Sequence, residues 1–263
     1  MSQHSIKSFS AALFEKSFYL AFANIFIFFK SPLKVLFCYV FEIGNYPQRF
    51  FVRTPLGLQG VETFSHSDLI TLVECFGKLD YIAPRDISVV VDFGSNVGIS
   101  ALYFLTRNQS IKVYLFEPVP QNILRLKKNL KGFESRYILR ECAVGIERGQ
   151  FDFACDETGR YGGLIKGGAP HFSQSDQKII SVKVIPANQV LEEILCEHKF
   201  LDILKIDVEG YENKILSHLS LGIISCVDRI YAETTDYPKL QGFAAKRYGG
   251  LTRYFREKKC DSF

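Results

Sequence analysis

From Tyr81 onward, short apolar runs alternate with stretches whose apolar residues recur at helical spacing. The apolar runs are rich in β-branched residues and show almost no polar alternation, which is typical of strands buried on both faces. This alternation predicts an α/β fold in which helices cover both faces of a mostly parallel sheet. The predicted strands are ISVVVDF (87–93), KVYLFEP (112–118), YILRECAV (137–144), LDILKID (201–207) and DRIYAE (228–233), and the predicted helices are SALYFLTRN (100–108), NILRLKKNL (122–130), NQVLEEIL (188–195) and ENKILSHL (212–219).

The most apolar part of the chain lies near its start. Residues 17–29 (SFYLAFANIFIFF) carry no charge, and residues 35–41 (VLFCYVF) follow after two lysines and a proline. A spanning helix needs roughly 20 apolar residues, so a span here would carry those three residues through the bilayer. We expect residues 17–41 to pack as a helical cap on the protein, or alternatively to lie on a membrane surface. The lysines that would then face lipid phosphates are Lys7, Lys16, Lys30 and Lys34.

The following residues predict two smaller elements. Residues 50–64 (FFVRTPLGLQGVETF) alternate apolar and polar side chains around one proline and two glycines, which predicts a hairpin. Ser67 is expected to cap a helix that continues to about Phe76. We therefore predict an N-terminal region of apolar helix, hairpin and helix over residues 1–80, and a second domain over residues 81–263.

Charge and cysteine content narrow the choice of partners and compartment. The 32 Lys and Arg and 28 Asp and Glu leave a net charge of +4, and the basic residues form no stripe, so nucleic acid is not an expected partner. The seven cysteines include no C-x-x-C pair, and an odd number cannot all pair internally. A reducing compartment fits best, so we expect a cytoplasmic protein, with membrane association as the alternative. The sequence does not indicate an oligomeric state.

A glycine-rich turn follows the first predicted strand of the second domain. In parallel sheets, ligands bind beyond the carboxyl ends of the strands, where the strand order reverses. Gly94 and Gly98 allow a tight turn there, and Asn96 tolerates a positive φ angle. Asp92 is expected to accept hydrogen bonds from a ligand's ammonium or from amides of the turn. The spacing G-x-N-x-G differs from the G-x-G-x-x-G of dinucleotide-binding folds and lacks the Gly-Lys-Ser/Thr ending of a P-loop.

The ends of the next two strands predict further contacts with the same ligand. Glu117 lies 19 residues beyond Gly98 (117 − 98) and ends the second strand. An acid at about this distance is placed to accept both hydroxyl groups of a ribose. The third strand, predicted over residues 137–142, ends near Ala143, which is expected to contact an adenine ring through its backbone.

At this point the chain resembles a known family. The motifs VVVDFGSNVGISALYF, YLFEPVPQNILRLKKNL, ECAVG and DILKIDVEGYENKIL occur in the order found in FkbM-type methyltransferases, over roughly residues 61 to 235. The resemblance implies a Rossmann-like class I methyltransferase fold with a mostly parallel seven-stranded sheet. It also implies S-adenosylmethionine as the methyl donor and a hydroxyl group as the acceptor. A sugar, a glycolipid or a polyketide-like molecule could carry that hydroxyl.

The chemistry is expected after the strand over residues 201–206. Methyl transfer to an alcohol needs alignment with the donor and removal of a proton from a weak acid. Asp207 is our first candidate for the base or acceptor-orienting group, and Glu209 the second; alternatively, either residue caps the next helix while Lys205 pairs with one of them. Glu233, at the end of the neighbouring strand, is a further candidate. These carboxylates could instead bind a divalent ion such as Mg²⁺, which is the less favoured interpretation.

Residues 156–181 contain five glycines and few large apolar residues, which predicts a mobile loop near the acceptor. Within this loop, Arg160, Tyr161 and His171 could bind the acceptor, and His171 is an alternative base. Two other functions are compatible with the same architecture: a NAD-dependent oxidoreductase, and a membrane-associated binding protein without catalysis. The turn spacing argues against the first, and the presence of Asp207 and Glu209 argues against the second.

Overall fold

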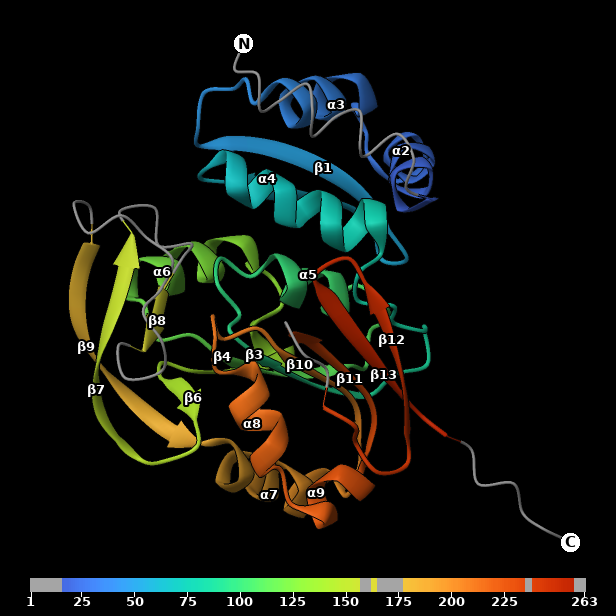
Figure 1. Ribbon diagram of the computed structural model, residues 1–263. Coiled ribbons are helices and arrows are strands. Elements are labelled where there is room, and N and C mark those ends of the chain that lie inside the picture. The colour runs from blue at the N-terminus through green and yellow to red at the C-terminus, as the bar shows by residue number, and fades with distance from the viewer. Residues whose placement is uncertain (1–15, 157–161, 165–176, 235–237, 258–263) are drawn as a thin grey trace, which may run out of the picture. The chain divides into compact units, whose positions relative to one another are not determined.

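The computed structural model describes residues 16–156, 162–164, 177–234 and 238–257 (Figure 1). The chain forms two compact units, Met1–Ile82 and Ala83–Phe263. The predicted division into separate domains at residues 80 and 81 stays a prediction, because compactness does not establish that each part folds independently.

The N-terminal unit combines a hairpin with helical segments. Its strands β1 (Gln48–Thr54) and β2 (Gly57–Thr63) pair antiparallel with Phe50 opposite Val61, which confirms the predicted hairpin. The helical segments are α2 (Lys16–Phe28), α3 (Pro32–Phe41), α4 (His66–Val73) and the π-helical turn η1 (Glu74–Lys78). Apolar side chains from these elements form its core, including Ile25, Phe29, Val35, Val52, Val61, Leu69 and Leu72.

Helix α4 begins two residues earlier than predicted. Its N-cap is Ser65, whose Oγ accepts a hydrogen bond from the N–H of Asp68, and the Asp68 carboxylate accepts from the N–H of Ser65 in return. This reciprocal pair satisfies two backbone donors that the helix itself leaves open, so it stabilises the start at Ser65. The prediction that Ser67 caps the helix is wrong.

The two apolar N-terminal helices are short. Helix α2 has 13 residues and α3 has 10, whereas a spanning helix needs roughly 20. Among the described residues, no helix combines the length and the apolar character needed to cross a membrane.

The second unit contains the predicted seven-stranded, mostly parallel sheet. The strand order is β12-β13-β11-β10-β3-β4-β5, in which the run from β11 to β5 is parallel and β13 is antiparallel to both its neighbours. This confirms the predicted Rossmann-like α/β architecture. The strands are β3 (Val89–Phe93), β4 (Lys112–Phe116), β5 (Tyr137–Arg140), β10 (Leu201–Ile206), β11 (Val227–Glu233), β12 (Phe243–Tyr248) and β13 (Leu251–Arg256).

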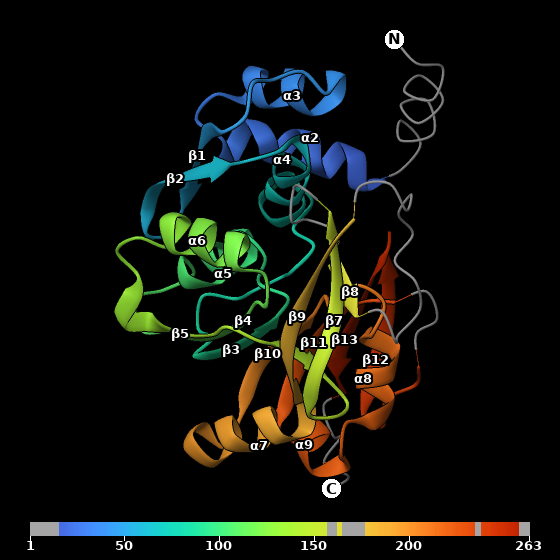
Figure 2. The same ribbon diagram turned by 90° about the vertical axis from the view of Figure 1, so that its left-hand side faces the viewer.

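Helices cover both faces of this sheet, as its apolar strands require (Figures 1 and 2). Helices α5 (Ile99–Leu105) and α6 (Pro120–Asn129) lie on one face, and α7 (Ala187–His198), α8 (Glu212–His218) and α9 (Leu221–Ser225) lie on the other. From β3 the chain runs outward through β4 to β5 and then returns to β10 on the other side of β3. The strand order therefore reverses between β3 and β10, where a ligand site is expected.

A second, four-stranded sheet corrects two predictions. It consists of β6 (Ala143–Gly145), β9 (Gln177–Pro186), β7 (Gly149–Asp156) and β8 (Gly162–Leu164), in that order. The third strand of the main sheet ends at Arg140, so Ala143 begins a strand of this other sheet and does not end the predicted one. The described parts of the predicted loop over 156–181 are strands, because residues 162–164 and the first residues of β9 both pair with β7.

Candidate active site

A pocket opens at the carboxyl ends of β3, β4 and β10, all within the second unit. It encloses about 590 Å³ of space between atoms, which includes open solvent at its mouth. Its position matches the reversal of strand order. The lining residues are Gly94, Asn96, Phe116, Glu117, Pro118, Val119, Asn122, Ala143, Val144, Phe153, Asp207, Val208 and Glu209.

The turn after β3 packs directly against the backbone that follows β10. Gly94 has a φ of +78°, and a Cβ atom on it would lie 1.7 Å from the carbonyl oxygen of Asp207. The N–H groups of Gly94 and Ser95 both donate to the carbonyl oxygen of Phe116, at 3.1 and 3.0 Å, and the N–H of Asp207 donates to that of Phe93 at 3.1 Å. Only glycine fits at position 94, because any side chain would force the two strand ends apart.

Two other residues of this turn have different surroundings. Asn96 has a φ of +46° and lines the pocket, and its Oδ1 atom is buried with no hydrogen-bond partner among the residues that the structure describes. Gly98 has a φ of +84° at the N-cap of α5, where a Cβ atom would meet the side chain of Leu126 at 3.1 Å. Asn96 is thus one of the residues that line the pocket, whereas Gly98 serves the packing of α5 against α6.

Glu117 is a buried carboxylate in the wall of the pocket. Its Oε2 accepts a hydrogen bond from the N–H of Asn96 at 2.9 Å, and its Oε1 accepts from the N–H of Val119 at 3.0 Å and from Asn122 Nδ2 at 3.3 Å. Burial raises the pKa of Glu117 to about 7, although these hydrogen bonds oppose the shift. The Glu117 carboxylate thus joins the turn after β3 to the start of α6 and titrates near neutral pH.

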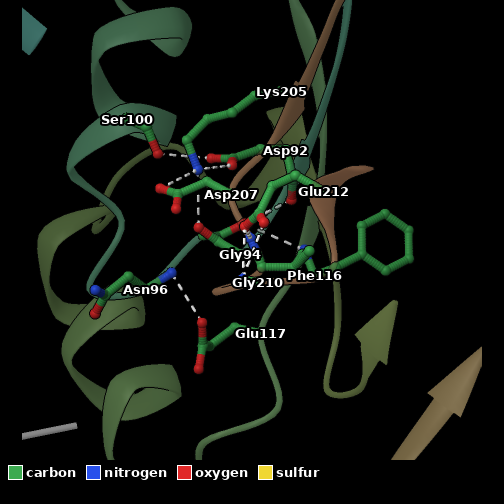
Figure 3. A network of polar contacts seen from close by, with 12 residues as sticks. Asp92, Gly94, Asn96, Ser100, Phe116, Glu117, Lys205, Asp207, Gly210 and Glu212 are labelled. Atoms are coloured by element: carbon green, nitrogen blue, oxygen red, sulfur yellow. Dashed lines mark hydrogen bonds and ion pairs between the residues drawn. The ribbon is translucent and has the colours of Figure 1, made fainter. Parts of the chain in front are cut away.

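A buried lysine connects the two strand ends behind the pocket (Figure 3). Lys205 Nζ lies 2.9 Å from Asp92 Oδ1 and 3.2 Å from Asp207 Oδ2, and it donates to the carbonyl oxygen of Gly94 at 2.9 Å. Ser100 Oγ donates to Asp92 Oδ2 at 2.7 Å. The side chains of Lys205 and Asp92 are 2% and 0% exposed, so the charges of this network interact with little screening by water.

The charges around Lys205 keep it protonated. Burial alone would lower the pKa of Lys205, but the neighbouring charges of Asp207 and Asp92 raise it above its ordinary value. Burial raises the pKa of Asp92, and the contacts with Lys205 and Ser100 oppose that shift. The ammonium group therefore supplies a fixed positive charge between two carboxylates.

The turn from Asp207 to Gly210 is held by a different residue from those predicted to cap α8. Glu212 accepts hydrogen bonds from the N–H of Val208 at 2.9 Å and from that of Gly210 at 2.9 Å. The N-cap of α8 is Tyr211, which makes no side-chain capping bond. Asp207 and Glu209 thus do not cap this helix, and both line the pocket.

The backbone at Glu209 is in an uncommon conformation. Its φ is +55°, in the left-handed region of backbone conformation that residues other than Gly, Asn and Asp rarely adopt. Glu212 holds this turn in place from the inside, through its bonds to Val208 and Gly210. The strained turn presents the Glu209 side chain at the solvent-exposed side of the pocket.

The predicted site residues fall into three groups. Six of them line the pocket together: Gly94, Asn96, Glu117, Ala143, Asp207 and Glu209. Asp92, Gly98 and Glu233 are not among the lining residues, and both carboxylate oxygens of Asp92 already have partners within the chain. His171, Arg160 and Tyr161 lie outside the described residues.

Sequence reasoning missed several residues of the site. The sequence predicts Lys205 only as a partner of Asp207 or Glu209, whereas its ammonium group also contacts Asp92 and the carbonyl oxygen of Gly94. The signal was a lysine inside an otherwise apolar buried strand, which must have a charged partner. The apolar wall formed by Val144 and Phe153 could not be recognised, because it comes from the second sheet.

Of the carboxylates considered for a metal ion, Asp207 forms an ion pair with a buried lysine. Within the described ranges, no group of three or more His, Cys, Asp or Glu side chains is placed to hold a metal ion. Glu233 is exposed at the end of β11. The ammonium group of Lys205 lies between Asp92 and Asp207.

Comparison with known proteins places this pocket in a family context. Residues 92–257 match the family model described as "Methyltransferase FkbM domain". This match begins at the end of β3 and includes every residue that lines the pocket. No curated protein matches the chain.

Several solved structures are similar to the chain at low identity. A methyltransferase from Geobacter sulfurreducens is 12% identical with a TM-score of 0.38, over 66% of this chain and 73% of that one. Methyltransferase FkbM from Methylobacillus flagellatus KT is 13% identical with a TM-score of 0.41, over 72% of this chain and 54% of that one. The C-terminal domain of precorrin-6Y C5,15-methyltransferase from Rhodobacter capsulatus is 12% identical with a TM-score of 0.34, over 72% of this chain and 89% of that one.

Proposed function

The chain belongs to the FkbM methyltransferase family, and from this premise we propose that it transfers a methyl group from S-adenosylmethionine to a hydroxyl oxygen. The acceptor that we propose is a sugar, a glycolipid or a polyketide-like molecule. One observation carries the proposal: a single pocket is lined both by the buried carboxylate of Glu117 and by the carboxylates of Asp207 and Glu209. The first suits a ribose, and the other two suit an alcohol that must lose a proton.

The residues of the pocket fit S-adenosylmethionine. Glu117 would accept hydrogen bonds from the ribose hydroxyl groups, and Asn96 lines the pocket beside it. Ala143, Val144 and Phe153 form an apolar wall suited to the adenine ring. When bound, the cofactor supplies an electrophilic methyl group on a positively charged sulfur.

Asp207 is the proposed base or acceptor-orienting group. Within the described part of the chain, its carboxylate makes one polar contact, the ion pair between Oδ2 and Lys205 Nζ at 3.2 Å. That contact fixes the orientation of the side chain while leaving Oδ1 able to accept a proton or a hydrogen bond from a hydroxyl group. Glu209 is the second candidate, because it lines the same side of the pocket.

A direct comparison of ligands tests the cofactor assignment. We expect calorimetric titration of the purified chain to detect binding of S-adenosylmethionine and no binding of NAD. The spacing of Gly94, Asn96 and Gly98 lacks the third glycine that dinucleotide-binding turns use for close helix packing. Binding of NAD without S-adenosylmethionine would favour the oxidoreductase, and binding of neither would favour a non-catalytic protein.

Replacing Glu117 with alanine is expected to weaken binding of S-adenosylmethionine by about 2 to 4 kcal/mol, because two charge-assisted hydrogen bonds to the ribose are lost. Calorimetry measures the effect, with Glu141→Ala as the control, since Glu141 is an exposed glutamate that pairs with Lys127. Thermal melting without ligand shows whether the pocket itself survives. Unchanged affinity in a folded Glu117→Ala variant would remove Glu117 from the cofactor site.

The affinity for S-adenosylmethionine is also expected to depend on pH through Glu117. Because burial raises the pKa of Glu117 to about 7, the carboxyl group becomes protonated as the pH falls below neutrality. Its value as an acceptor is then lost, so affinity should fall by up to about tenfold for each pH unit below 7. Titrations from neutral to mildly acidic pH should give a flatter profile for Glu117→Gln. Equal slopes for the two proteins would assign the pH dependence to another group.

A further inference from the structure

The N-terminal unit exposes many large apolar side chains on α2 and α3. Six of them have exposed fractions between 44% and 71%, and we call them the apolar face: Tyr19, Phe22, Phe26, Leu33, Phe37 and Phe41. Exposed apolar residues are common singly, but here three recur at helical spacing on each of the two helices, and such a stripe usually marks a surface that contacts something else.

The opposite side of α2 already supplies the core of this unit. Ala21, Ile25 and Phe29 are at most 6% exposed, and Asn24 donates to the carbonyl oxygen of Gly77 at 2.7 Å. Helix α2 is therefore apolar around most of its circumference, and packing among residues 16–82 accounts for only one side. A helix of this kind needs an apolar environment on its second side as well.

The apolar face is organised as neighbouring aromatic pairs. The ring centroids of Phe22 and Phe26 lie 5.1 Å apart on α2, and those of Phe37 and Phe41 lie 5.0 Å apart on α3. Each pair is one helical turn apart, so its rings form a continuous strip along the helix. Aromatic strips on short surface helices are suited to the boundary between lipid headgroups and acyl chains.

The charged residues within α2, α3 and the turn between them are lysines, and the acidic Glu42 follows only at the C-cap of α3. Residues 16–41 contain lysines but no Asp or Glu. Lys30 lies 5.5 Å from the ring centroid of Phe51, and Lys34 lies 5.3 Å from that of Phe50. Their ammonium groups thus lie beside apolar surface, as in helices that bind anionic lipids.

We propose that the apolar face and Lys30 and Lys34 bind the surface of a membrane that contains anionic lipids. The charge favours lipid over a second copy of the chain, because two copies joined through this face would bring like charges together. Neither α2 nor α3 is long enough to cross the bilayer, so the contact is peripheral. This inference is independent of methyl transfer, and its failure would leave the proposed reaction unaffected.

Vesicle sedimentation with the full chain tests the proposal. We expect the chain to sediment with vesicles of phosphatidylcholine and phosphatidylglycerol, and much less with phosphatidylcholine alone. Each lysine near an anionic surface strengthens binding by about fivefold, so Lys30→Glu with Lys34→Glu should weaken it by at least about tenfold. Leu33→Ser with Phe37→Ser should weaken it by at least about tenfold as well, because two exposed apolar side chains that binding would bury in the membrane are lost.

Matched variants in the second unit control for general changes of charge and surface. Lys131→Glu with Lys246→Glu makes the same change of charge at exposed positions. Leu124→Ser with Leu221→Ser removes side chains that are 70% and 65% exposed. All four double variants are expected to keep the melting temperature within a few degrees, because the changed side chains are on the surface.

Several results would overturn the membrane assignment. These are no sedimentation with anionic vesicles, equal binding to neutral vesicles, and equal weakening by the control variants. Resistance of the bound chain to alkaline carbonate would show that it is inserted in the bilayer. Sedimentation velocity that finds a dimer, lost in Leu33→Ser with Phe37→Ser, would assign the apolar face to a second copy of the chain.

Discussion

Replacing Asp207 with asparagine is expected to lower the rate of methyl transfer by about 10²- to 10⁴-fold, the usual contribution of a general base. Asparagine keeps the shape of the side chain and its ability to accept a hydrogen bond, but it cannot take a proton at neutral pH. The affinity for S-adenosylmethionine should stay close to that of the unmodified chain, because Glu117 and the turn after β3 are untouched. The measurements are formation of S-adenosylhomocysteine with a panel of glycan and glycolipid acceptors, and calorimetry with S-adenosylmethionine.

Asp202→Asn is the matched control for this variant. Asp202 lies at the other end of β10, where its Oδ2 accepts hydrogen bonds from the N–H groups of Ser88 and Val89, both at 2.8 Å. It should therefore keep the rate. An Asp207→Asn variant that turns over at the unmodified rate would exclude Asp207 as the base. If that variant instead loses thermal stability together with activity, Asp207 is structural, and Glu209, Glu233 and His171 become the next candidates.

Replacing Lys205 with methionine is expected to reduce the free energy of unfolding by about 3 to 5 kcal/mol, one of the largest effects available to a single change in this chain. Methionine fills the volume of the lysine stem but leaves the fully buried Asp92 without its cation. The carbonyl oxygen of Gly94 loses its hydrogen bond from Lys205 at the same time. Chemical denaturation with urea measures the loss.

The exposed ion pair between Lys127 and Glu141 provides the comparison. The Lys127 side chain is 51% exposed, so Lys127→Met should cost less than about 1 kcal/mol. If Lys205→Met proves too unstable to purify, the double change Lys205→Met with Asp92→Asn removes the stranded charge and should recover part of the loss. A loss in Lys205→Met no larger than in Lys127→Met would show that the Lys205 network adds little to stability.

The strands that form the centre of the sheet could be predicted from the sequence, because strands buried on both faces consist of short runs of apolar residues. The predicted strands over 87–93 and 201–207 contain β3 and β10, which are apolar except for Asp92, Asp202 and Lys205. The division between β5 and β6 could not be predicted, because the apolar run resumes directly after Arg140 and Glu141 and does not show that it joins another sheet. Which sheet Ala143 joins depends on pairing with Val184 in β9, and that contact is not encoded locally.

For the site, the sequence predicted which residues lie at the pocket better than it predicted the side chains with which they pair. The positions of Glu117 and Asp207 at the pocket could be predicted, because each follows a buried strand at the edge of the sheet where ligands bind. Asp92 was predicted to contact the ligand, but its partner is Lys205, which is 113 residues away in the sequence. A contact at that separation is determined by the order of the strands, so it becomes visible only once β3 and β10 are known to be neighbours.

The direct packing of Gly94 on the Asp207 carbonyl has a consequence for the entropy of binding. The ends of β3, β4 and β10 are tied together through this contact, through the shared acceptor at Phe116 and through Lys205. Fixing the backbone of a residue costs about 1 to 2 kcal/mol of conformational entropy, and here that cost is met when the protein folds. A ligand that enters a site already ordered in this way loses less of its binding energy to the immobilisation of protein groups. The affinity of this pocket should therefore depend mainly on the contacts that its ligands make, and little on rearrangement of the strand ends that hold them.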